Sequence, residues 1–124
     1  MIQISPEQIM YTKLRRICDE LGYTVYDYLS DSEAEFPFVV LGEQFSQTVR
    51  EHKEFTTKDV QTTIHVWHND WRQRGTVTKM LREIELAIVR EFGIDGEDIS
   101  TQILPDDTTG TALYHGILET DIRI

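Results

Sequence analysis

Residues 60–88 read VQTTIHVWHNDWRQRGTVTKMLREIELAI, and this stretch decides the fold. Its first eight residues alternate between the two sides of the chain, which is the period of a strand with one buried face. From residue 77 onward, apolar residues recur three and four positions apart, which predicts an amphipathic helix. Asn69 or Asp70 can cap this helix, and Gly93 can end it. Its apolar stripe comprises Val77, Met80, Leu81, Ile84, Ala87 and Ile88.

A second amphipathic helix is indicated near the start of the chain. Ser5 is a good N-cap residue, Pro6 suits the first helical position, and Gln8 completes a capping-box pattern. Gly22 is placed to end the helix. The apolar residues at helical spacing are Met10, Leu14, Ile17, Cys18 and Leu21. Because the single cysteine belongs to this stripe, we expect a small buried hydrophobe rather than a reactive thiol.

Four further stretches have the composition of strands: residues 23–29, 36–41, 99–104 and 111–124. The segment 105–110 between the last two is dense in turn residues, which predicts a hairpin. The order along the chain is therefore α-β-β-β-α-β-β. We predict a single α+β domain over residues 1–124, with two amphipathic helices packed on one face of an antiparallel sheet.

The charge balance restricts the partners that this chain can bind. It has 22 acidic and 12 basic residues among 124, for a net charge of −10. Binding to a phosphate backbone depends on Lys and Arg, so the chain is a poor candidate for tight nucleic-acid binding. The start of the chain lacks a secretory signal, and no apolar run approaches the ~20 residues of a membrane span, so no membrane partner is expected.

The sequence carries no recognisable catalytic, cofactor-binding or metal-binding motif, so we expect no catalytic residue, no cofactor and no enzyme activity. His65 and His68 are three residues apart in the predicted strand and would point to opposite faces. His65 could meet His115 across the sheet, but two histidines fall short of a zinc site. Histidines exposed on the sheet face are the better interpretation, and a small enzyme remains an alternative that would require a clustered polar pocket.

Two segments are candidates for contacts with other proteins. Residues 49–59 form a charged connection that we expect to project from the sheet, and the alternative is a solvated loop without a partner. Trp67 and Trp71 flank the junction of strand and helix, where they either anchor that corner or form an interface hot spot. The candidate residues in the charged connection are Arg50, Lys53, Glu54 and the isolated Phe55.

Four segments carry a resemblance to a known family. They are FPFVVLG at residues 36–42, QTTIHVW at residues 61–67, VTKML at residues 77–81 in the second helix, and LYHGILETDIRI at residues 113–124. In these segments and their order, the chain resembles the small tail completion proteins of tailed bacteriophages, which are related in fold to the tail terminator of lambda-like phages. The similarity covers most of the chain.

The resemblance implies a structural protein of the virion rather than a catalyst. Its members form a homo-oligomer, commonly a hexameric ring, that caps the tail tube and joins it to the head connector. DNA would pass through the ring without specific binding, and an acidic lumen would repel its phosphates. The implied location is the head-tail interface of the virion, after assembly in the host cytoplasm. The alternative that the residues leave open is a small adaptor or regulatory domain that binds another protein.

Overall fold

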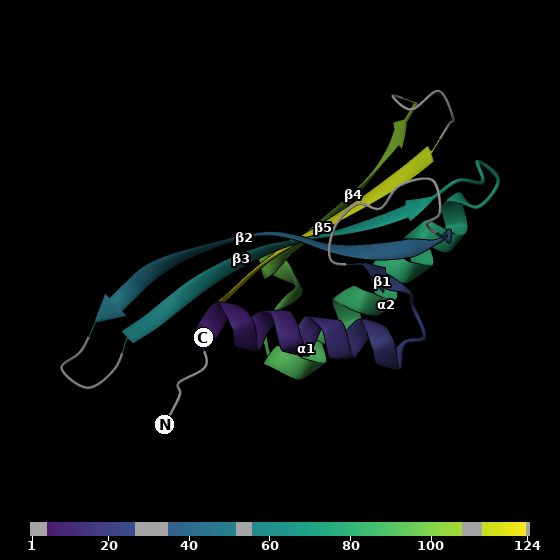
Figure 1. Cartoon of the computed structure of the whole chain (residues 1–124). Coiled ribbons are helices and arrows are strands. Elements are labelled where there is room, and N and C mark those ends of the chain that lie inside the picture. The colour runs from purple at the N-terminus through teal and green to yellow at the C-terminus, as the bar shows by residue number, and fades with distance from the viewer. Residues whose placement is uncertain (1–4, 27–34, 52–55, 108–112, 124) are drawn as a thin grey trace.

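The computed structural model describes residues 5–26, 35–51, 56–107 and 113–123, and its elements follow the predicted order α-β-β-β-α-β-β (Figure 1). This confirms the α+β class. A single turn of 3-10 helix, Gly96–Asp98, precedes the fourth strand. The helices are α1 (Pro6–Glu20) and α2 (Arg74–Phe92), and the strands are β1 (Val25–Tyr26), β2 (Phe38–Glu51), β3 (Thr56–His68), β4 (Ile99–Asp106) and β5 (Leu113–Arg123).

The five strands form one sheet in the order β1-β2-β3-β5-β4. Three of the four pairings are antiparallel, but β1 pairs with β2 in parallel, with Val25 opposite Val39. The prediction of a purely antiparallel sheet is therefore wrong at this edge. Parallel neighbours need a connection that returns the chain to the end from which it started. The composition of residues 27–37, which connect the two strands in sequence, gives no sign of the direction.

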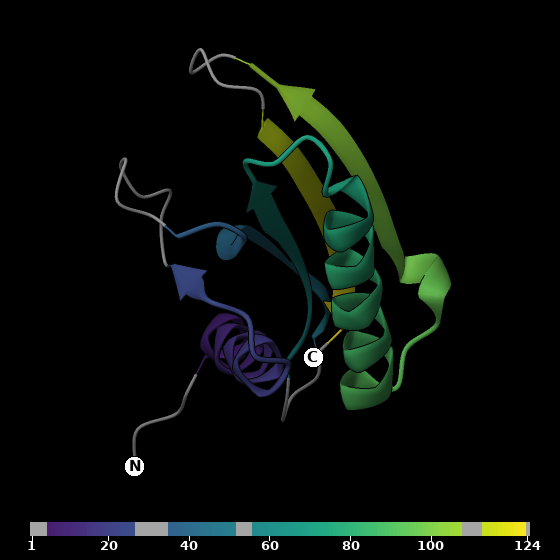
Figure 2. The same cartoon turned by 90° about the vertical axis from the view of Figure 1, so that its right-hand side faces the viewer.

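Both helices pack on the same face of the sheet, as predicted (Figure 2). α1 lies against β1, β2 and β3, whereas α2 lies against β3, β5 and β4. An ion pair between Arg16 of α1 and Glu91 of α2 ties the two helices together, and Tyr23, shortly after α1, donates a hydrogen bond to Glu83 of α2. Buried side chains of both helical stripes and of the facing strands form one core, and Cys18 is completely buried within it, as expected.

The ends of the helices show which capping predictions were correct. The Ser5 hydroxyl accepts a hydrogen bond from the Gln8 amide at 3.2 Å, and Gly93 ends α2 with a positive φ of 64°. The prediction that Asn69 or Asp70 caps α2 is wrong, since α2 begins at Arg74 with Gln73 as its N-cap. Asp70 instead accepts a hydrogen bond from the Arg72 amide at 3.0 Å, which stabilises a turn before the helix.

The predicted connection at residues 49–59 is largely strand. β2 continues to Glu51 and β3 begins at Thr56, so the two form one long hairpin that reaches past the N-terminal end of α1 (Figure 1). Two register shifts in β2, between Leu41 and Gln44 and between Thr48 and Arg50, each insert one extra residue. No helix in the described part of the chain is long and apolar enough to cross a membrane.

Candidate functional site

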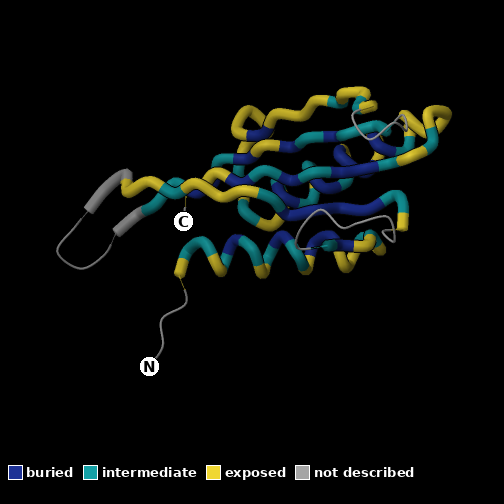
Figure 3. Tube along the Cα trace, turned by 45° about the horizontal axis from the view of Figure 1, so that its top comes forward, coloured by how far each residue is buried: buried dark blue, intermediate teal, exposed yellow. Residues whose placement is uncertain are grey.

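The hairpin of β2 and β3 becomes two-stranded where its neighbours end. Among the described residues, β1 pairs with β2 only as far as Val40, and β5 pairs with β3 only as far as Asp59. Residues 48–51 of β2 and 56–58 of β3 therefore have each other as their only strand partner among the described residues, and we call these two segments the arm. Figure 3 shows exposed positions along the part of β2 that leads into the arm. Isolated two-stranded hairpins are marginally stable in water, so an arm of this kind gains stability from a partner.

The first bulge in β2 determines which side chains of the strand are exposed. Before the bulge, Val39 and Leu41 face the helices and belong to the core. After it, Gln44 lies opposite the buried Thr62 and Phe45 lies opposite the exposed Gln61, so Phe45 points away from the helices. Phe45 is 61% exposed, one of the largest apolar surfaces on the described part of the molecule.

The N-terminal turn of α1 holds the base of the arm. Lys58 pairs with Glu7 at 3.9 Å, and the Gln44 amide donates to the Glu7 carbonyl oxygen at 3.3 Å. A hydrogen bond from Ser46 is the main reason why the pKa of the Glu7 carboxyl lies below its ordinary value, and Lys58 contributes to the same shift. These contacts fix the direction in which the arm leaves the body of the protein.

The face of the sheet opposite the helices carries a second, smaller apolar cluster. Phe38, Val40 and Trp67 are buried there, and Trp67 is 9% exposed. The Phe38 ring packs edge-on against Tyr26 with 5.2 Å between ring centroids. Because its ring is already buried within the monomer, Trp67 anchors this face, which favours the structural interpretation of this tryptophan.

Two histidines meet beside this cluster, as the strand positions suggested. His65 Nδ1 lies 2.7 Å from His115 Nε2, and the His115 ring stacks on Trp67 with 3.8 Å between centroids. Burial, and then the proximity of His65, lowers the pKa of His115 below its ordinary value. Glu43 lies 3.5 Å from the other ring nitrogen of His65. The histidines are thus half-buried and paired rather than exposed.

The histidine pair can hold a proton between its rings, but its surroundings do not form a metal site. Within the described ranges, no three His, Cys, Asp or Glu side chains gather in a way that could hold a metal ion. Gly42 makes room for the pair, since a Cβ at this position would lie 2.7 Å from His65 Nε2 and 3.1 Å from the Thr63 carbonyl oxygen. The absence of a side chain at Gly42 thus leaves space for the His65 ring.

The remaining predicted interface residues fall in different places. Trp71 is 70% exposed in the turn between β3 and α2, so its ring is available to a partner. The Arg50 backbone belongs to β2, opposite Thr57, and the structure describes its backbone but not its side chain. Lys53, Glu54 and Phe55 lie outside the described residues, so their predicted role stays a prediction.

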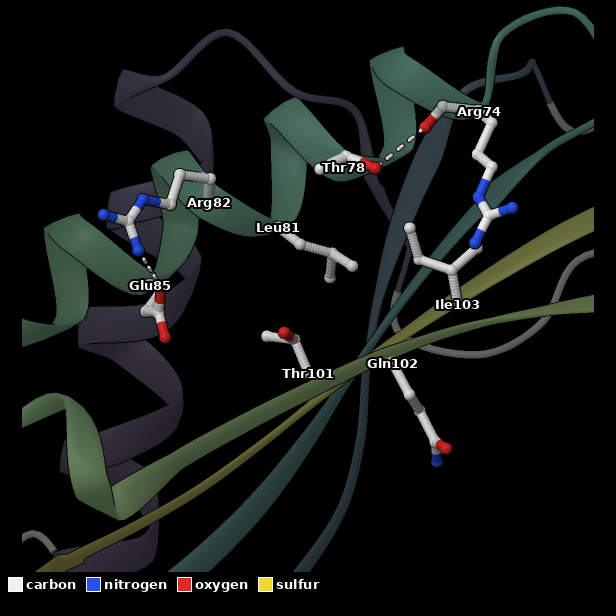
Figure 4. A pocket seen from close by; sticks show the side chains of 8 residues that line it. All are labelled: Arg74, Thr78, Leu81, Arg82, Glu85, Thr101, Gln102 and Ile103. Carbon is white, nitrogen blue, oxygen red and sulfur yellow. Dashed lines mark hydrogen bonds and ion pairs between the residues drawn. The ribbon is translucent and has the colours of Figure 1, made fainter.

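The opposite edge of the sheet has a hollow between α2 and β4, with a volume of about 330 Å³. Thr101 and Ile103 of β4 point toward α2, while Gln102 points away (Figure 4). Leu81 forms the apolar wall, and the ion pair of Arg82 with Glu85, at 3.0 Å, lies at its rim together with Arg74. The outer edge of β4 has no strand partner among the described residues.

Sequence reasoning missed two exposed apolar residues on these edges, Phe45 in β2 and Leu104 in β4, which is 44% exposed. A signal was present, because each lies in a strand segment without charged residues: QFSQTV at residues 44–49 and ISTQILP at residues 99–105. No family model matches this chain, and no curated protein matches it either. The surfaces themselves are therefore the basis for inferring a function.

Proposed function

We propose that this protein is a structural subunit that associates with copies of itself into a ring, of the kind that caps a phage tail tube and joins it to the head connector. The observation that carries the proposal is the two-stranded arm, which extends the β2–β3 hairpin beyond β1, beyond β5 and past the N-terminal end of α1. A two-stranded extension is marginally stable on its own, and a neighbouring subunit that covered it would stabilise it.

Exposed apolar side chains on separate parts of the molecule support self-association. Phe45 lies at the base of the arm, Trp71 lies in the turn before α2, and Leu104 lies on the edge strand β4. Aromatic residues are enriched among the side chains that dominate the energy of protein interfaces. Surfaces at different positions on one chain allow head-to-tail contacts, which close into rings when the rotation between neighbours permits.

The acidic composition supports the role proposed for the ring centre. A closed ring of chains with a net charge of −10 accumulates negative charge. Negative charge around an opening repels the phosphates of DNA, so the polymer slides through without adhering. We propose that the ring guides DNA between head and tail without binding a specific sequence, and that the protein acts in the virion without catalysing a reaction.

Electron microscopy of the purified protein, together with sedimentation velocity over a range of concentrations, tests self-association. We expect particles with a central opening, in equilibrium with monomers as the protein is diluted. In the phage whose genome encodes the chain, removing the gene should leave complete heads and complete tails that do not join. A protein that stays monomeric at every concentration and binds one different protein would be an adaptor, and complete particles formed without the gene would exclude the joining role.

A further inference from the structure

We infer that neighbouring copies join edge to edge, with the outer edge of β4 in one copy pairing with the outer edge of β2 in the next. This inference rests on the proposed self-association and specifies its contact. It starts from the sheet order β1-β2-β3-β5-β4, in which β4 lies at one side and, within the part of the chain that the structure describes, β2 has no strand partner on its other side beyond Val40. Each copy therefore presents two different free edges, which is the requirement for a head-to-tail chain of subunits.

Both free edges lack the charged side chains that commonly protect edge strands from pairing. Natural sheets protect exposed edges with charged residues, proline, β-bulges or very short strands. β4 is uncharged from residue 99 to residue 105, and its only proline, Pro105, comes near its end. β2 is uncharged from residue 44 to residue 49, between its two bulges. In a chain that is 27% charged, both segments thus lack the charges that would oppose main-chain pairing with another strand.

The hollows beside β4 match the alternating side chains of an added strand. The hollow of about 330 Å³ toward α2 lies on one face of β4, and a second hollow of about 200 Å³, which includes Gln102 and Ile117, lies beside the strand. A strand added to an edge places alternate side chains on opposite faces, so main-chain bonds give affinity and the hollows give selectivity.

The side chains of β2 fit this arrangement when the helices of both copies lie on the same side of the continued sheet. Gln44 and Ser46 face the helix side, where their hydrogen bonds to Glu7 of the same copy hold them against α1. Phe45 faces the opposite side. Leu104 also faces that side, since it lies opposite His115, whose ring stacks on Trp67.

The pairing therefore brings two exposed apolar side chains together. Phe45 of one copy and Leu104 of the next are 61% and 44% exposed in the monomer, and both become covered on the face opposite the helices. A second copy of this chain is thus the occupant that both edges fit, because the same pairing that continues the sheet also covers the two exposed apolar side chains.

Two single variants, each blocking one edge, test the inference. Leu104→Lys blocks the β4 edge and Phe45→Lys blocks the β2 edge, because each places a charge where apolar contact is expected. Each should weaken self-association at least about tenfold in sedimentation velocity. The matched control is Leu86→Lys, since Leu86 is 46% exposed on the solvent side of α2 and should assemble like the wild type. Circular dichroism and thermal melts establish that all three variants fold.

Mixing the two blocked variants gives the sharpest result. The Leu104→Lys protein keeps an intact β2 edge and the Phe45→Lys protein keeps an intact β4 edge, so an equal mixture should form one-to-one dimers and nothing larger. If the wild type assembles but the blocked variants assemble equally well, or their mixture forms no dimer, the edge pairing is overturned and the ring proposal still stands. Wild type that remains monomeric throughout overturns the proposed self-association and this inference with it.

Discussion

Replacing Thr120 by valine should stabilise this protein. Thr120 is 2% exposed, and its hydroxyl oxygen has no hydrogen-bond partner among the residues that the structure describes. It lies on the helix side of β5, directly opposite Thr62 of β3. Burial of a hydroxyl without a hydrogen bond costs roughly 1–3 kcal/mol in protein mutational data. Valine keeps the branched shape and removes the polar atom, so the cost of desolvating the hydroxyl disappears.

We expect Thr120→Val to raise the free energy of unfolding by about 1 kcal/mol, at the lower end of that range, because polar Thr62 shares the site. For a domain of this size the melting temperature should rise by about 4 °C. Thr62→Val is the matched control, since Thr62 is also 2% exposed but accepts a hydrogen bond from the Gln44 amide at 3.4 Å. Loss of that bond should lower stability by about 0.5–1 kcal/mol.

Urea unfolding measures the free energy of unfolding of both variants, with the fluorescence of the buried Trp67 as the signal. The protein concentration is kept in the range where sedimentation shows monomers, since assembly would add to the apparent stability. The midpoint should rise for Thr120→Val and fall for Thr62→Val, with the slope unchanged. A Thr120→Val protein that is less stable than the wild type, or a Thr62→Val protein that gains as much, would refute the reasoning.

Three other predictions follow from the described contacts. A Cβ added at Gly116 would lie 2.8 Å from Val77 Cγ1, so Gly116→Ala should lower the free energy of unfolding by about 1–3 kcal/mol. When Val77→Ala is combined with it, the total loss should be smaller than the sum of the two single losses by at least about 0.5 kcal/mol in a double-mutant cycle. Because the pKa of His115 is lowered from 6.5 in the folded state, the unfolded chain binds more protons as the pH falls. The free energy of unfolding should therefore fall as the pH drops below 6.5. Thermal melts between pH 7.5 and 5 should show a smaller fall for His115→Asn, because this variant lacks the titrating group. Burial raises the pKa of the Cys18 thiol to about 12, so a thiol reagent at pH 8 should label Cys18 only when the protein unfolds locally or globally. Rapid labelling of the native protein would contradict that burial.

The core could be predicted from the sequence because periodicity reports directly on burial. Val77, Met80, Leu81, Ile84 and Ile88 are all buried at the positions that helical spacing indicated. Strand alternation likewise placed the buried residues of β3 on one face and His65 on the other, which allowed the contact between His65 and His115 to be anticipated. In both cases the signal is local, since each side chain's environment follows from its position in a regular element.

The arm could not be predicted because its sequence lacks the alternation of apolar and polar residues that indicates a half-buried strand. Residues 49–59 are mostly charged or polar and their order suggested a loop, whereas the backbone of residues 49–51 and 56–59 is held in a ladder. Whether β1 pairs parallel or antiparallel to β2 depends on the course of the connection between the two strands, and composition does not determine that course. Asp70 has the chemistry of a helix cap, but the same carboxylate also stabilises a turn, and the structure uses it for the turn.

The first bulge in β2 separates the part of the strand that serves the core from the part proposed to serve assembly. With strict alternation, the residues following Val39 and Leu41 on the helix side would include Phe45. The inserted residue shifts the order by one, so Gln44 occupies that side and donates hydrogen bonds to Glu7 and Thr62. The aromatic ring is thereby delivered to the exposed face, at the free edge of the sheet. Because the bulge places Phe45 outside the core, substitutions at Phe45 should alter association while the core beneath the helices stays unchanged.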